Sequence, residues 1–129
     1  MRRWPIIAVV LVVACSPAVR VTTLAPVRFP PRPATYPIRI YREQRPRCAF
    51  EEVALISAAP KIITHNNEAL ADALRVKARE LGGDAIIGIS TESRVTGASP
   101  SSSGNGVDLD RATILSGTVI HFKSADCTE

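Results

Sequence analysis

The chain has 129 residues, with 16 lysines and arginines, 12 acidic residues and a formal net charge of +4. This length allows one domain and leaves no room for a second hydrophobic core. The sequence contains no phosphate loop, no catalytic-triad motif and no patch of mixed basic and aromatic residues, so we expect neither an enzyme nor a nucleic-acid-binding protein.

The first residues have the layout of an export signal. Arg2 and Arg3 precede an apolar run at residues 5–14, and a basic start followed by a short apolar core is typical of a signal peptide. The run is too short for a membrane-spanning helix, which needs about 20 apolar residues. Without Arg2 and Arg3 the 16 basic residues fall to 14 against 12 acidic ones, a net charge of +2.

The end of this apolar run, Val-Val-Ala-Cys at residues 12–15, is similar to a bacterial lipobox. That resemblance implies that residues 1–14 are removed as a lipoprotein signal peptide and that Cys15 is lipidated, with palmitate among its acyl chains. Ser16 stands where an aspartate would indicate retention in the inner membrane, so we expect the outer membrane. The alternative is an ordinary secretion signal cleaved at a nearby alanine, with Cys15 lost or left free.

Residues 15–37 are rich in proline and show no helical or strand periodicity. Because proline fixes φ and lacks an N–H donor, we expect this segment to be a lipidated, semi-rigid tether with a reach of at most about 65 Å. Arg20, Arg28 and Arg32 are spread along it. The alternative to a solvated linker is a basic arm that contacts lipid phosphates or a partner.

Residues 38–129 are predicted to form a small α+β domain. Its first two strands are expected at residues 37–42 and 50–59. A helix follows, with capping side chains before it and an apolar face along it. The capping candidates are Thr64, Asn66 and Asn67, and the apolar face contains Leu70, Leu74, Ala78 and Leu81. Gly82 and Gly83 end this helix, because glycine accepts the left-handed conformation of a helix stop.

Two more strands are expected at residues 84–95 and 111–123, separated by a Ser/Gly-rich loop at residues 97–106. The resulting order, β-β-α-β-β, predicts one helix packed on a mostly antiparallel sheet. Gly88 and Gly117 lie inside these strands and indicate bulges or close packing. Both strands carry apolar residues on more than one face, and one helix covers only one face, so the other face could meet a partner or a second copy.

Residues 78–88 resemble the motif of YbjQ-like domains, in which a helix, a Leu-Gly-Ala-Asn/Asp-Ala turn and an apolar strand follow one another. The matching positions are Ala78, Leu81, Gly82, Gly83, Asp84, Ala85 and Gly88. Together with the lipobox and the proline-rich segment, the chain is similar to RcsF-like outer-membrane lipoproteins, which sense envelope stress. The resemblance implies a non-enzymatic domain that is held by its lipid anchor on the periplasmic side and contacts an envelope protein. RcsF-like domains carry four cysteines, whereas this domain carries only two.

Those two, Cys48 and Cys127, follow the first and the last predicted strand of the domain. Thiols of an exported protein meet an oxidising compartment, and antiparallel packing could bring these strand ends together, so we expect a disulfide. The alternatives are free thiols or a bridge to another chain.

The second functional hypothesis is a metal-binding domain, which some members of the family are proposed to be. The available ligands are Cys48, Cys127, His65 and His121, all isolated in sequence, whereas a structural zinc site needs four that converge. We expect His121 to be a surface residue and His65 to belong to the turn before the helix. No cofactor and no catalytic residue is therefore expected.

Overall fold

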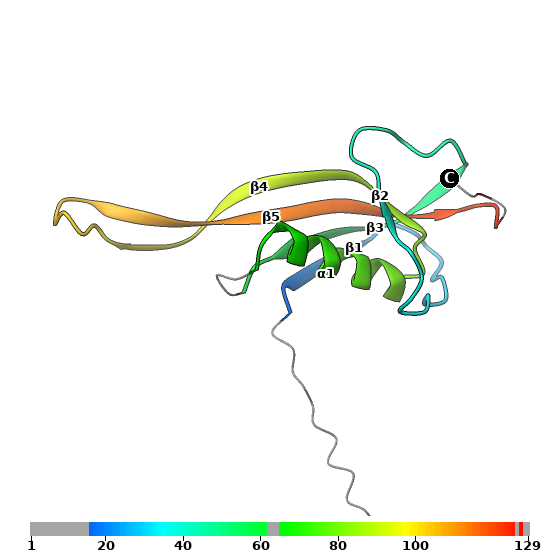
Figure 1. Ribbon diagram of the computed structural model, residues 1–129, viewed down its shortest axis with the longest axis horizontal. Helices are drawn as coiled ribbons and strands as arrows, with labels where there is room; N and C mark the ends of the chain where they lie inside the picture. The colour runs from blue at the N-terminus through cyan, green and yellow to red at the C-terminus, as the bar shows by residue number, and fades with distance from the viewer. Residues whose placement is uncertain (1–15, 62–64, 126, 128–129) are drawn as a thin grey trace, which may run out of the picture.

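The computed structural model describes residues 16–61, 65–125 and 127, and shows one helix packed on a five-stranded sheet (Figure 1). The predicted α+β class with a mostly antiparallel sheet is confirmed, with one additional strand at the N-terminal side. The elements are β1 (Ala18–Thr23), β2 (Arg39–Ile40), β3 (Phe50–Ala59), α1 (Asn67–Glu80), β4 (Ala85–Pro100) and β5 (Val107–Phe122).

The strands lie in the order β1-β3-β5-β4-β2. All neighbouring pairs are antiparallel except β2 and β4, which run parallel. The strand predicted at residues 37–42 is thus reduced to a two-residue strand at the sheet edge, whereas β3 matches its predicted bounds.

The helix begins and ends where its sequence predicts. The side chain of Asn66 accepts a hydrogen bond from the backbone N–H of Ala69 at 2.9 Å, which satisfies one of the free N–H groups of the first turn. The helix stops at Leu81 and Gly82, and Gly82 has a positive φ of 74° that favours glycine. Thr64, another predicted capping residue, lies outside the described residues.

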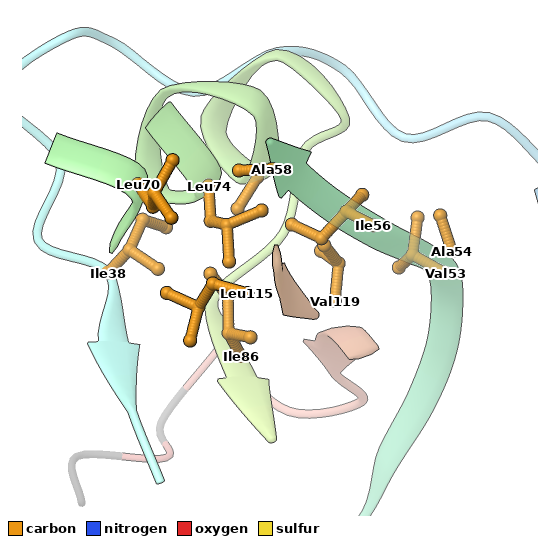
Figure 2. Packing of buried hydrophobic residues seen from close by; sticks show 11 residues of the cluster. Ile38, Val53, Ala54, Ile56, Ala58, Leu70, Leu74, Ile86, Leu115 and Val119 are labelled. Carbon is orange, nitrogen blue, oxygen red and sulfur yellow. The ribbon is translucent and has the colours of Figure 1, made fainter. Parts of the chain in front are cut away.

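The core lies between α1 and the face of the sheet that the helix covers (Figure 2). Leu70, Leu74 and Ala78 are buried on the helix, as its apolar spacing predicts, and they pack against side chains from three strands and from the segment before β2. Those partners are Ile38, Val53, Ala54, Ile56, Ala58, Ile86, Leu115 and Val119.

Gly88 and Gly117, the two glycines inside the strands, lie at a bulge and at a close contact between strands, as the sequence indicates. The register of β4 on β5 shifts between Ile87 and Ser90, and Gly88 in this bulge has a φ of 63°. A Cβ on Gly117 would lie 2.6 Å from a methyl carbon of Ile86, so only glycine allows the two strands to pack this closely.

The prediction of a solvated spacer is wrong for part of residues 15–37. Ala18–Thr23 form β1, which pairs with β3 in register from Ala18 opposite Ala59 to Thr23 opposite Ala54. The prolines at positions 17 and 26 bracket this run and leave its N–H groups available for the sheet. Residues 29–36 then pack on the domain as well.

The Ser/Gly-rich loop is also shorter than predicted. β4 continues to Pro100 and β5 starts at Val107, so the connection spans only residues 101–106. Small side chains at residues 97–99 lower strand propensity, but they do not interrupt the backbone ladder, which continues to the pair of Pro100 and Val107.

Candidate functional site

The residues that resemble the YbjQ-like motif build the connection from α1 to β4. Ala78 and Ala85 are fully buried, and Leu81 closes the helix. A Cβ on Gly82 would lie 2.6 Å from Cβ of Phe29, and one on Gly83 would collide with the side chain of Val119. The motif glycines therefore allow two segments distant in sequence to approach the end of the helix.

Asp84, the charged residue of this motif, is buried and accepts hydrogen bonds from residues that are distant in sequence. It is 8% exposed, and its Oδ1 atom accepts hydrogen bonds from Nη2 of Arg32 at 2.8 Å and from the hydroxyl of Tyr36 at 2.6 Å. Its Oδ2 atom accepts one from the backbone N–H of Phe122 at 2.8 Å. A buried carboxylate is stable only when it is paired and hydrogen-bonded in this way.

Arg32 and Tyr36 belong to residues 29–36, which we call the strap. The strap N–H of Arg32 donates to the carbonyl of Arg79 at 2.7 Å, and Nε of Arg79 donates to the carbonyl of Tyr36 at 2.6 Å. The guanidinium of Arg32 lies 4.8 Å from the centre of the Tyr36 ring. The strap is thus fastened to the C-terminal end of α1 by backbone and side-chain bonds together.

His121 belongs to the same cluster, so the prediction that it is a plain surface residue is wrong. Its Nδ1 atom lies 3.0 Å from the carbonyl oxygen of Gly82 and 3.3 Å from Oδ2 of Asp84. Both neighbours are acceptors, so Nδ1 carries a hydrogen. The imidazole stacks on the ring of Phe29 with centroids 4.0 Å apart. The bend of the strap brings Phe29 to it, and the local sequence around His121 gives no sign of this.

The cluster changes the acidity of one phenol. The hydrogen bond to Asp84 raises the pKa of Tyr36 above its ordinary value of 10.0, and burial and the charge of Asp84 add to the effect. Arg32 acts in the opposite direction. Tyr36 therefore stays a hydrogen-bond donor to Asp84 up to strongly alkaline pH.

Cys48 and Cys127 form a disulfide, as expected, with their Cα atoms 6.1 Å apart. It joins the segment before β3 to the residues after β5, close to the end of the sheet where Asp84 lies. The bridge takes both thiols out of the set of ligands that the metal-binding alternative needs.

The two histidines of that alternative set also lie apart. His65 accepts a hydrogen bond from the backbone N–H of Lys61 before α1 begins, whereas His121 contacts Gly82 beyond the helix end. The 14 residues of α1 separate them by about 21 Å. Within the described ranges no group of three or more His, Cys, Asp or Glu side chains is placed to hold a metal ion.

A second feature is the outer half of the β4–β5 hairpin, residues 93–113, which we call the arm (Figure 1). β3 follows β5 only as far as Leu115, and β2 pairs with β4 only at Ala85 and Ile86. In the part of the chain that the structure describes, the arm is therefore a two-stranded ribbon that extends beyond the sheet.

One face of the arm carries its exposed apolar side chains, which Arg111, opposite Val95, interrupts on the side nearer α1. Residues opposite each other in an antiparallel pair share a face, and the pairs of Leu109 with Ala98 and of Val107 with Pro100 lie together. Val95, Val107 and Leu109 are 47%, 62% and 51% exposed. The other face carries Asp108 and Asp110. The inner half of the hairpin, residues 85–92 and 114–122, is called the root. Alternation along β5 places Leu109 on the same side as Leu115 and Val119, which α1 covers at the root.

Cys15 and the predicted signal peptide, residues 1–14, lie outside the described residues. Among the residues described, none of the helical segments has the length and apolar character needed to cross a membrane. The chain matches no known protein family, no curated protein and no solved structure. The resemblance to YbjQ-like and RcsF-like proteins stays a prediction.

Proposed function

We propose that this protein is a non-enzymatic interaction module that a lipid on Cys15 anchors to the periplasmic side of the outer membrane, where it senses envelope stress through a protein partner. The lipobox-like sequence at residues 12–15 supports the anchor. The disulfide between Cys48 and Cys127 supports an oxidising compartment, because thiols of cytosolic proteins are kept reduced.

The observation that carries the interaction role is the apolar face of the arm. This face continues the row of β5 side chains that the helix buries at the root. Arg111 and Thr113 still share a hollow with residues at the start of α1, whereas Val107 and Leu109 lie farther out. Leu109 and Val107 are more than half exposed there. Contiguous exposed apolar side chains are typical of a protein-binding surface.

The architecture of the arm also supports a role in binding a partner. An isolated two-stranded ribbon is only marginally stable in water, so the arm contributes little to the stability of the domain. A partner that lies on Val95, Ala98 and Leu109 would take the place that α1 has at the root. The strap and the disulfide fix the other end of the hairpin, so the arm projects in a defined direction from the anchored domain.

The interaction can be tested with a photo-crosslinking amino acid at Leu109 in living cells. The matched control places it at Asp108, the neighbouring residue on the opposite face of the same strand. We expect a discrete protein adduct from position 109 that is at least five-fold weaker from position 108. Equal adducts from the two faces, or none from either, would contradict the proposal.

The anchor is tested separately by the intact mass of the protein extracted from membranes, measured after thiol alkylation with and without reduction. We expect the mass of an acylated N-terminal Cys15, and alkylation of Cys48 and Cys127 only after reduction. Fractionation should place the protein with the outer membrane, and a Cys15→Ala variant should be lost from that fraction.

A further inference from the structure

The folded domain begins very close to the predicted lipid. β1 starts at Ala18, three residues after Cys15, and is held by β3 from its first residue. An extended chain covers at most about 3.6 Å per residue, so three residues allow a lipidated Cys15 at most roughly 11 Å of distance from the start of the sheet. A lipid on Cys15 would therefore hold the domain at the membrane surface, without the long tether that the sequence predicts.

The structure has a hollow of about 600 Å³ at this point, between β1 and the outer side of α1. Ser16 and Pro17, the first described residues, line one side of it. Its apolar lining is made by Pro17, Val19, Ala69, Ala73 and Val76. The hollow thus opens directly beside Ser16, the residue that follows Cys15 in the sequence.

The helix side of this hollow has an apolar strip between charged residues. Ala69, Ala73 and Val76 follow one another at helical spacing, and Val76 is 51% exposed. The short alanine side chains leave room, and Val76 gives the recess an apolar wall.

The charges at the rim are paired. Nζ of Lys77 lies 2.7 Å from Glu80, and Nη1 of Arg75 lies 2.6 Å from Asp72. Paired rim charges leave the hollow without a strong field of one sign, which favours a hydrocarbon occupant over an ion.

We propose that this hollow receives an acyl chain of the lipid on Cys15. The inference rests on the proposed lipidation, and it names the ligand class as a saturated hydrocarbon chain that is covalently part of the same molecule. The short link from Cys15 to Pro17 delivers the chain to the hollow, and the apolar wall of α1 holds it there. The outer side of α1 then faces the leaflet, and the lipid orients the domain as well as anchoring it.

The experiment labels cells that express the full chain with a palmitate analogue carrying a diazirine, followed by irradiation and peptide mapping. We expect the acyl adduct on the peptides of α1 that contain Ala73 and Val76. The adduct yield should not depend on protein concentration, because the contact is intramolecular. Val76→Asp, which places a charge in the hollow, and Ala73→Trp, which fills it, should each lower the yield at least five-fold.

The matched control is Val95→Asp, which changes an equally exposed valine on the arm and should leave the adduct unchanged. Circular dichroism and the disulfide state check that each variant is folded. Adducts confined to phospholipids, or adducts equally strong in Val76→Asp, would overturn the inference while leaving lipidation intact. A protein that takes up no label would reject the lipid anchor itself, and the inference with it.

Discussion

The inner and outer halves of the β4–β5 hairpin belong to the same two strands but differ in burial and in the elements that flank them. At the root, Ile86 and Val119 are fully buried under α1, and β2 and β3 flank the pair. In the arm, Val107 and Leu109 are more than half exposed on a ribbon of two strands. The difference indicates that the root carries the stability of the domain, whereas the arm is free to be specialised for contact.

The largest expected effect is at the root, where the disulfide closes a loop with a sequence separation of 79. Replacing both Cys48 and Cys127 by alanine should lower the free energy of unfolding by about 4 kcal/mol, because the unfolded chain regains the entropy that the cross-link removed. Urea unfolding of the soluble domain measures this. A loss below about 1 kcal/mol would mean that the bridge is not a main determinant of stability.

Leucines at the root and in the arm should respond very differently to truncation. Leu74→Ala should lower the free energy of unfolding by about 3 kcal/mol, since this side chain is 0% exposed and its loss leaves a cavity. Leu109→Ala is the matched control on the arm and should cost about 0.5 kcal/mol or less. Similar losses for the two variants would show that the arm belongs to the folding core.

The Asp84 cluster gives a third test at the root. Asp84→Asn keeps the shape of the side chain but removes the charge that Arg32 and Tyr36 bind. The free energy of unfolding of the domain should therefore fall by about 2 kcal/mol. The change also weakens the interaction that raises the pKa of Tyr36.

The pH dependence of stability should report on the same contact. Because the pKa of Tyr36 is raised in the folded state, its contribution is present below pH 10.0 and is lost as the pH rises through the folded-state value. The free energy of unfolding should therefore fall above pH 10.0 in the natural protein, and less steeply in Asp84→Asn. Near-ultraviolet absorbance titration, with Tyr36→Phe to isolate the signal of Tyr41, follows the phenol directly.

Local signals in the sequence were sufficient for the elements of the root. The helix has a capping side chain at Asn66, buried residues at helical spacing and a glycine stop, and β3 is a continuous strand-forming run. These features depend on residues within a few positions of one another. For that reason they could be predicted without knowing the fold. The disulfide between Cys48 and Cys127 is not local, and it is predicted from the expected oxidising compartment and from the positions of the two strand ends.

The strap and β1 could not be predicted in the same way. Only Val19 of β1 is partly covered, so the strand carries no clear alternation, and it exists because β3 offers a free edge. Arg32 and Tyr36 meet Asp84 across 52 and 48 residues of sequence. Asp84, a charge at the start of a buried strand, was the available signal that a partner had to come from elsewhere in the chain.

Removing the arm altogether should also have little effect on stability. A variant in which Asn-Gly joins Ser93 directly to Thr113, a pair that lies opposite in the ladder, keeps the root register and closes it with a turn suited to the strand twist. Its free energy of unfolding should change by less than about 1 kcal/mol, because the deleted ribbon buries almost no apolar surface. The same variant should lose binding to the partner captured at position 109, which a pull-down with that partner measures. If the shortened domain were destabilised by several kcal/mol, the arm would be part of the fold, and its exposed leucine and valines would need no partner to explain them.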